Sequence, residues 1–81
     1  MNIVELEKRL ESERIPHHVY SLNGGLPSEA FCLEQLGSKW PYYYSERGYR
    51  RNVVYFEREE DACDFLYARI MRGMKSYQWW G

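Results

Sequence analysis

Histidines, cysteines and glutamates are the residues of this 81-residue chain that can bind a metal or carry catalysis. His17 and His18 are adjacent, and adjacent residues of a strand point to opposite faces, so the pair does not share one metal ion. A site would also need Cys32 or Cys63, and no metal-ligand spacing connects them. The sequence therefore predicts no metal site, and two ordinary histidines at the start of a strand.

Nucleophilic catalysis needs a serine or cysteine beside a histidine and an orienting acid, and no nucleophile elbow or oxyanion loop surrounds such residues here. Glu29, Glu34 and Glu46 are candidates for acid–base chemistry, but twelve acidic residues make some pairing expected by chance. A chain of this length leaves little room for a deep pocket. We predict a protein that is not an enzyme and binds no cofactor, and an enzyme using Glu29 and a histidine is the weakest interpretation.

The densest run of amphipathic aromatic residues is the stretch at 40–51, WPYYYSERGYRR. In a strand, alternate residues share a face. We expect Trp40, Tyr42 and Tyr44 to pack beneath helices, which leaves Tyr43 and Arg47 on the opposite, outward face. Tyrosine and arginine are common at the energetic centres of protein interfaces. The stretch therefore predicts a surface that holds another molecule.

Composition narrows the class of partner. The net charge is −1 and the pI is about 6.1, whereas a general nucleic-acid binder usually has a clear positive excess. A local basic patch stays open, because basic residues cluster in the sequence at Arg47, Arg50 and Arg51 and again at Arg69, Arg72 and Lys75. Residues 1–14 lack the apolar region of an export signal, and no stretch approaches the roughly 20 apolar residues of a membrane helix. We therefore expect a cytoplasmic protein whose two cysteines are reduced, buried and inert.

Hydrophobic periodicity and turn residues predict an α+β fold. We expect an antiparallel three- or four-stranded sheet, with an N-terminal and a C-terminal helix packed on one face and the other face open. Pro41 predicts that its strand is an edge there, or pairs on its other side. The predicted elements are a helix capped by Asn2 and running to about Arg14, strands over 17–22, 29–35, 39–46 and 51–56, a hairpin turn within 47–51, and a helix that opens at 57–60 and ends at Gly73.

The predicted organisation is one small domain over residues 1–81. Residues 73–81 have no clear periodicity and are expected to form a loosely packed tail. Its Trp79 and Trp80 either fold back on the core or await a partner.

The run NGGLPSEAFCLEQLGSKWPYYYSERG, followed by EREEDACDFLYARI, resembles small bacterial immunity proteins of polymorphic-toxin and contact-dependent inhibition systems. The resemblance covers about residues 23–70. Its most specific part is the Tyr-Ser-Glu-Arg-Gly run at 44–48, while Pro41 and the C-terminal tail depart from the pattern. The other shared features are Leu26-Pro27 with Glu29, the Cys32-Leu33 strand, Trp40, and Glu60 to Cys63 at the start of the last helix.

This resemblance implies a cytosolic protein that binds one cognate toxin domain and blocks its active site or substrate groove. Immunity proteins of nuclease toxins often present acidic groups to a basic toxin. In this chain Glu29, Glu34, Glu46, Glu57 and Glu59 are the candidate acidic groups.

The residues that we expect to bind the partner are Glu34, Tyr43, Glu46, Arg47 and Tyr49. A direct pair between Glu46 and Arg47 across the turn is the structural alternative for those two residues. The alternative function is a small nucleic-acid or regulatory binding module that uses exposed tyrosines of the sheet.

Overall fold

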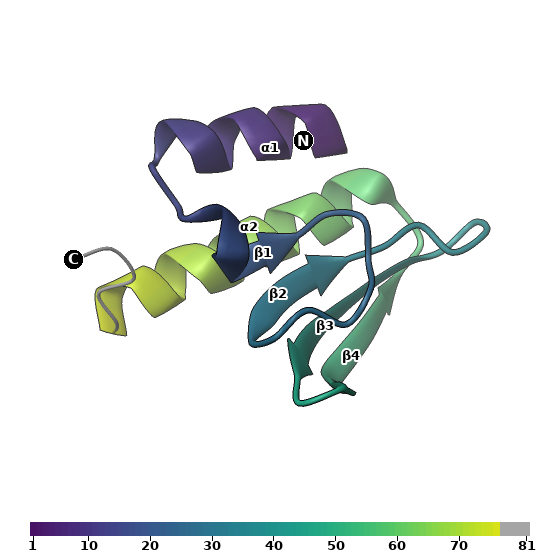
Figure 1. Ribbon diagram of the computed structural model, residues 1–81. Helices are drawn as coiled ribbons and strands as arrows, with labels where there is room; N and C mark the ends of the chain where they lie inside the picture. Colours follow the sequence, from purple (N-terminus) through teal and green to yellow (C-terminus); the bar gives the residue numbers. More distant parts are fainter. Residues whose placement is uncertain (77–81) are drawn as a thin grey trace.

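A computed structural model describes residues 1–76 and has the predicted α+β class (Figure 1). Trp79 and Trp80 lie outside the described residues, so the two alternatives for them stay predictions. In chain order the elements are α1 (Ile3–Ser12), the 3-10 helix η1 (His17–Val19), β1 (Tyr20–Ser21), β2 (Ala30–Leu33), β3 (Trp40–Glu46), β4 (Tyr49–Phe56) and α2 (Glu59–Ser76).

Helix α1 begins with the predicted capping box. The Asn2 side chain accepts a hydrogen bond from the Glu5 backbone N–H (2.8 Å), and the Glu5 carboxylate accepts one from the Asn2 N–H (2.9 Å). Leu6 and Leu10 are buried one turn apart. The helix ends at Ser12, slightly before the predicted end, because Arg14 takes a left-handed φ of 61° and the Ile15 N–H returns to the Leu10 carbonyl.

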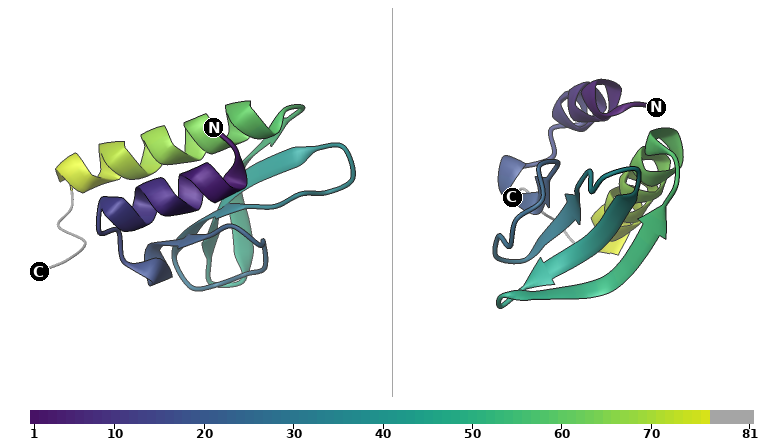
Figure 2. Two further views of the ribbon diagram at one scale, coloured as in Figure 1. Left: turned by 90° about the horizontal axis from the view of Figure 1, so that it is seen from above. Right: turned by 90° about the vertical axis from the view of Figure 1, so that its right-hand side faces the viewer.

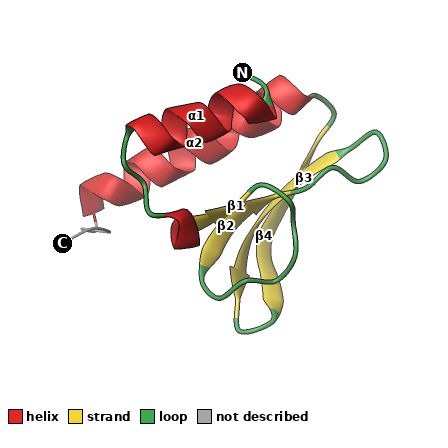
Figure 3. Ribbon diagram, turned by 45° about the horizontal axis from the view of Figure 1, so that its top comes forward, coloured by secondary structure: helices red, strands yellow, loops and turns green. Residues whose placement is uncertain are grey.

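The sheet has four strands in the order β1-β2-β3-β4, and it is mixed rather than antiparallel. The β2–β3 and β3–β4 pairs are antiparallel as predicted, but β1 pairs with β2 in parallel. The cause is the connection at 22–29, which Figure 3 draws as a long green arch from the end of β1 back to the start of β2. The predicted strand at 17–22 is correspondingly short, since Pro16 and the 3-10 turn take up residues 17–19.

Pro41 lies in an interior strand, and the sequence predicts two alternatives for it, an edge at this position or pairing on the other side. Strand β3 lies between β2 and β4. The Pro41 carbonyl accepts a hydrogen bond from the Glu34 N–H (3.1 Å), which places its backbone groups on the β2 side. Strand β2 ends at Leu33, so the side on which proline lacks an N–H lies beyond the last regular β2–β3 pair. This geometry matches the second alternative, pairing on the other side.

Both helices lie on one side of the sheet and run side by side in the same direction (Figure 2). Helix α2 lies against β2, β3 and β4, whereas α1 packs on α2, so the prediction that both helices pack on the sheet is confirmed only in part. Gly73 does not end α2, which continues to Ser76. The main core between these layers consists of Leu6, Leu10, Ile15, Val19, Phe31, Leu33, Tyr42, Ala62, Cys63, Leu66 and Ile70.

Candidate partner-binding site

The tip of the β3–β4 hairpin carries two of the five predicted partner-binding residues. Arg47 and Gly48 form the turn between the strands, and both have positive φ angles, 52° and 80°. Positive φ at both central residues is the requirement of a type I′ hairpin turn, whose twist matches that of the strands. Arg47 is exposed, and the Tyr49 side chain is 70% exposed. The predicted hairpin is confirmed, and it presents these two residues to solvent.

Glu46 forms an ion pair within its own sheet. Its carboxylate lies 2.9 Å from the Arg51 guanidinium, on the neighbouring strand. The alternative pair between Glu46 and Arg47 is therefore wrong, since Glu46 pairs with Arg51 and forms no ion pair with Arg47. A partner that used Glu46 would compete with Arg51 for the carboxylate.

Tyr43 is buried, so the predicted open sheet face was wrong at this position. Its side chain is 1% exposed and packs with Ala30 and Cys32 in a second apolar cluster, on the face opposite the helices. The 22–29 connection covers this cluster. The Tyr43 hydroxyl donates to the Gly25 carbonyl (2.6 Å), and the Ser45 hydroxyl donates to the Pro27 carbonyl (2.6 Å). Tyr43 and Ser45 thus anchor the 22–29 connection to the sheet.

Glu34 belongs to a cluster at the rim of this loop. Its Oε1 atom lies 3.4 Å from the Tyr43 hydroxyl and 3.6 Å from Nη2 of Arg50. The Arg50 guanidinium also lies over the Tyr43 ring, 4.8 Å from its centroid. Burial raises the pKa of Tyr43 to about 12, so it remains a neutral donor at physiological pH. Gly24 packs directly against this cluster and leaves no room for a side chain, because a Cβ atom there would lie only 2.8 Å from the Glu34 carboxylate.

The predicted acidic face is largely satisfied within the chain. Glu57 pairs with Lys39, and the Glu59 carboxylate accepts a hydrogen bond from the Ile3 N–H (2.8 Å). With Glu34 and Glu46 also engaged, only Glu29 of the five candidates lacks an ion pair or hydrogen bond within residues 1–76. The carboxylates therefore do not form a free acidic patch for a basic partner.

Strand β4 supplies an exposed surface that sequence reasoning missed. It is the long edge strand of the sheet, with eight residues, seven of them exposed. Tyr55 is 63% exposed and Val53 is 39% exposed, beside Tyr49 at the hairpin end. Their β-forming character predicts the strand, but nothing in the local sequence shows that this strand is an edge of the sheet. The order of the strands was the missing information.

The backbone N–H and C=O groups of Tyr55 form no hydrogen bond with β3. The Pro41 backbone groups face β2, and Pro41 is in register with Tyr55. Tyr55 is therefore in a non-hydrogen-bonded pair, and its own N–H and C=O point away from β3, toward the open edge. The other half of the strand is protected by Arg50, Arg51 and a bulge at Asn52, which are common devices against edge pairing.

The histidines and cysteines form no site together. His17 is exposed in η1, 3.7 Å from the Glu11 carboxylate. Cys32 and Cys63 are buried free thiols in separate apolar clusters, and burial raises the pKa of each to about 11. Within residues 1–76, no three histidine, cysteine or acidic side chains lie close enough to hold a metal ion.

Comparisons with protein-family models, curated proteins and solved structures find no match to this chain. In the part of the chain that the structure describes, neither helix combines the length and apolar character of a transmembrane segment.

Proposed function

We propose that this protein neutralises one cognate bacterial toxin domain by binding it through the edge of β4. The exposed edge strand is the observation that carries the proposal. Native proteins usually cover or charge a long edge, because its free backbone groups recruit other strands. Here the half at 53–56 is left apolar and uncharged. A strand of the partner that pairs there gains main-chain hydrogen bonds at Tyr55 and side-chain contacts with Val53.

The hairpin tip extends this surface. Tyr49 and Arg47 lie at the other end of β4 from Tyr55, and both are exposed. Tyrosine and arginine offer large contact areas and directional hydrogen bonds. A partner that pairs with the edge at 53–56 and also contacts the hairpin tip would bind along the whole length of β4. Inhibition then follows from steric coverage of the toxin's active site or substrate groove, with no chemistry by this chain.

The exposed tyrosines also suit the alternative, a module that stacks the bases of single-stranded nucleic acid on Tyr49 and Tyr55. The charges of β4 weigh against it. Arg50 is paired with Glu34 and Arg51 with Glu46, so neither is free to neutralise a phosphate without breaking an ion pair. The net charge of −1 supplies no compensating attraction.

Co-expression with the product of the gene immediately upstream tests the proposal, and two substitutions at position 55 test whether the β4 edge is the binding surface. Tyr55→Pro removes the edge N–H but no bond of the β3–β4 ladder, because that N–H points outward. Tyr55→Thr removes the aromatic ring but keeps the N–H. We expect Tyr55→Pro to weaken the complex about tenfold or more relative to Tyr55→Thr. The proline removes one main-chain hydrogen bond to the partner strand, and its ring also obstructs the approach of that strand.

The measurements are rescue of growth and calorimetric affinity for the purified toxin domain, with circular dichroism to confirm that both variants fold. Equal binding by the two variants would rule out strand pairing at this edge. A toxin that the wild-type protein neither binds nor neutralises would overturn the proposal as a whole. Steeply salt-dependent binding to oligonucleotides would then favour the alternative.

A further inference from the structure

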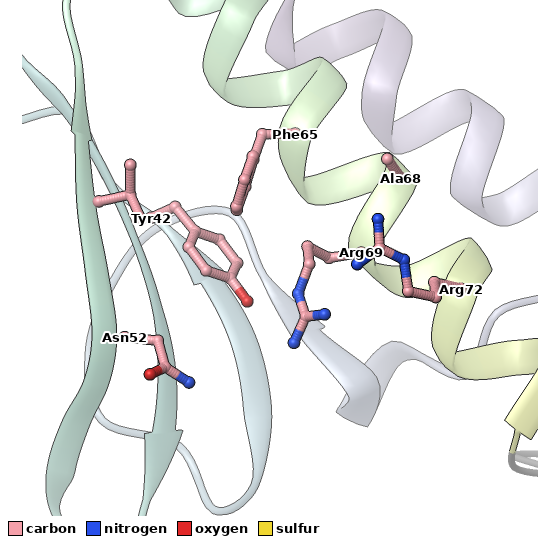
Figure 4. A pocket seen from close by; sticks show the side chains of 7 residues that line it. Tyr42, Asn52, Phe65, Ala68, Arg69 and Arg72 are labelled. Carbon is pink, nitrogen blue, oxygen red and sulfur yellow. The ribbon is translucent and has the colours of Figure 1, made fainter.

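A pocket of about 320 Å³ lies between α2 and the helix side of β3 and β4 (Figure 4). Its volume is roughly ten times the ~30 Å³ that one water occupies in the liquid, and it is at the small end of ligand pockets. Tyr55, which follows Val54 on the strand, points to the other face of the sheet, so the pocket is separate from the binding surface described above. Its lining residues are Tyr42, Asn52, Val54, Phe65, Ala68, Arg69 and Arg72.

The Tyr42 hydroxyl is the most informative group in this pocket. The side chain is 1% exposed, and the ring is fixed by an edge contact with Phe65, with 4.9 Å between centroids. Its hydroxyl oxygen is buried and has no hydrogen-bond partner among the described residues. Figure 4 shows this hydroxyl pointing into the hollow, toward Arg69. Buried hydroxyl groups nearly always have a partner, so a bound group that accepts a hydrogen bond from this hydroxyl explains the arrangement.

Two unpaired cations face the same space. Arg69 and Arg72 are three residues apart on α2, so they share a side of the helix. Neither forms an ion pair with a carboxylate of the described chain, in contrast to Arg58 just before the start of α2, which pairs with Glu60. No acidic residue lines the pocket. The guanidinium group is a rigid fork of donors that matches the oxygens of phosphate and carboxylate.

Asn52 adds a donor from the sheet side. It lies in the β4 bulge with a left-handed φ of 56°, a conformation that asparagine tolerates better than most residues. The bulge breaks the alternation of the strand and places the Asn52 carboxamide beside the pocket, below Tyr42 in Figure 4. The remaining wall is apolar and consists of Phe65, Val54 and Ala68.

We propose that this pocket binds the phosphate or carboxylate group of a small organic acid. Arg69 and Arg72 pair with the anionic group, and the Tyr42 hydroxyl and Asn52 carboxamide donate to its oxygens. The apolar body of the ligand packs against Phe65 and Val54, which accounts for a pocket larger than a bare ion needs. The inference does not depend on the proposed toxin, because Asn52 and Val54 line the pocket from the helix side of β4, and the pocket lining does not include Tyr49, Val53 or Tyr55.

A titration of the ¹⁵N-labelled full chain tests the site directly. The probes are phenyl phosphate and phenylacetate as anions, and benzyl alcohol as a neutral compound of similar shape. We expect saturable shifts of the Arg69 side-chain N–H and the Asn52 and Val54 amide signals with one or both anions, and none with benzyl alcohol. Inorganic phosphate should compete. Arg69→Gln should weaken anion binding about tenfold, whereas Arg58→Gln should leave it unchanged.

Tyr42→Phe provides a second test, in which the melting temperature without ligand and the rise in melting temperature caused by the ligand should change in opposite directions. Without ligand, it removes a buried hydroxyl that has no partner, so the melting temperature should stay the same or rise. With a saturating anion, the ligand-induced rise in melting temperature should shrink, because one hydrogen bond is lost. A purely structural tyrosine would not give this reversal.

The source of the anionic group is resolved by a further probe, a short peptide that ends in a free phenylalanine carboxylate. If the peptide binds with the same dependence on Arg69 and phenyl phosphate does not, the carboxylate chemistry holds and its source is a chain terminus. Binding of the neutral alcohol as tightly as the anions would overturn the proposal. So would anion affinity that Arg69→Gln leaves unchanged.

Discussion

Tyr43 shows how one hydroxyl group fixes a long connection to the sheet. The 22–29 connection is fastened at several points, and the shortest hydrogen bonds are those from Tyr43 and Ser45, each 2.6 Å. The Tyr43 ring meanwhile fills the small cluster with Ala30 and Cys32. The hydroxyl and the ring therefore have separable roles, and substitution by phenylalanine removes only the first.

We expect Tyr43→Phe to lower the free energy of unfolding by about 1 kcal/mol, the usual net contribution of one hydrogen bond. Urea denaturation followed by circular dichroism measures the change. The matched control is Tyr55→Phe, which removes a hydroxyl from an exposed side chain and should alter stability by less than about 0.5 kcal/mol. Equal effects of the two substitutions would show that the Gly25 contact contributes nothing to holding the loop.

At the scale of elements, the hairpin turn has an unusual residue at its first position. A type I′ turn favours Asn-Gly, whereas this turn has Arg47 at φ 52° followed by Gly48 at φ 80°. A left-handed conformation costs an ordinary L residue about 1 kcal/mol or more, and asparagine less. Arg47 is therefore retained at a cost to stability, which is consistent with a role at the exposed tip.

Substitutions in the turn should act in opposite directions. Arg47→Asn is expected to raise the free energy of unfolding, by up to about 1 kcal/mol. Gly48→Ala should lower it by about 1 kcal/mol through backbone strain alone, because a Cβ atom there meets no atom within 4 Å. Urea midpoints of the two variants test the pair. A loss of stability in Arg47→Asn would mean that the arginine makes contacts that offset its strain.

Local signals were sufficient for most of these elements. The capping residues Asn2 and Glu5 and the leucine spacing predict α1, and Gly48 with its flanking β-formers predicts the hairpin. The parallel β1–β2 pair was not predictable in this way, because it depends on the path of the 22–29 connection across the sheet. Gly73 also failed as a stop signal: α2 continues through it to Ser76, and a glycine inside a helix costs only about 1 kcal/mol.

The candidate sites depended even more on tertiary structure. Alternation correctly sent Tyr42 toward the helices and Tyr43 to the other face, but it could not show that a loop covers the second face. Strand order turned β4 into the edge, and a bulge brought Asn52 beside Arg69. Neither the strand order nor the bulge has a signature in the local sequence.

Across the whole molecule, an apolar cluster lies on each face of the sheet, and each cluster contains a buried side chain that ionises only at high pH. Cys63 lies in the main core, and Cys32 with Tyr43 lies beneath the loop. Burial raises the pKa of each thiol from 9.0 to about 11, and that of Tyr43 from 10.0 to about 12. In each case desolvation disfavours the charged form, so these groups stay protonated in the folded protein well beyond the pH at which the unfolded chain ionises.

This difference in pKa predicts that the free energy of unfolding falls as the pH rises above about 9. Below pH 9 the thiols are protonated in both states and their contribution is fully present. As pH rises from 9 to about 11, the unfolded chain releases protons that the folded chain keeps, so the free energy of unfolding falls, by at most about 1.4 kcal/mol per pH unit for each group.

Urea unfolding of the wild type and of Cys63→Ala, both in reducing buffer at about pH 8 and about pH 10.5, isolates one thiol. Removal of the sulfur leaves a small cavity whose cost is the same at both pH values, so the difference between the two values reports ionisation alone. We expect Cys63→Ala to lose less stability than the wild type over this interval. An equal loss in both proteins would mean that Cys63 ionises in the folded state as readily as in the unfolded chain, and that α2 opens enough to admit water to its buried face.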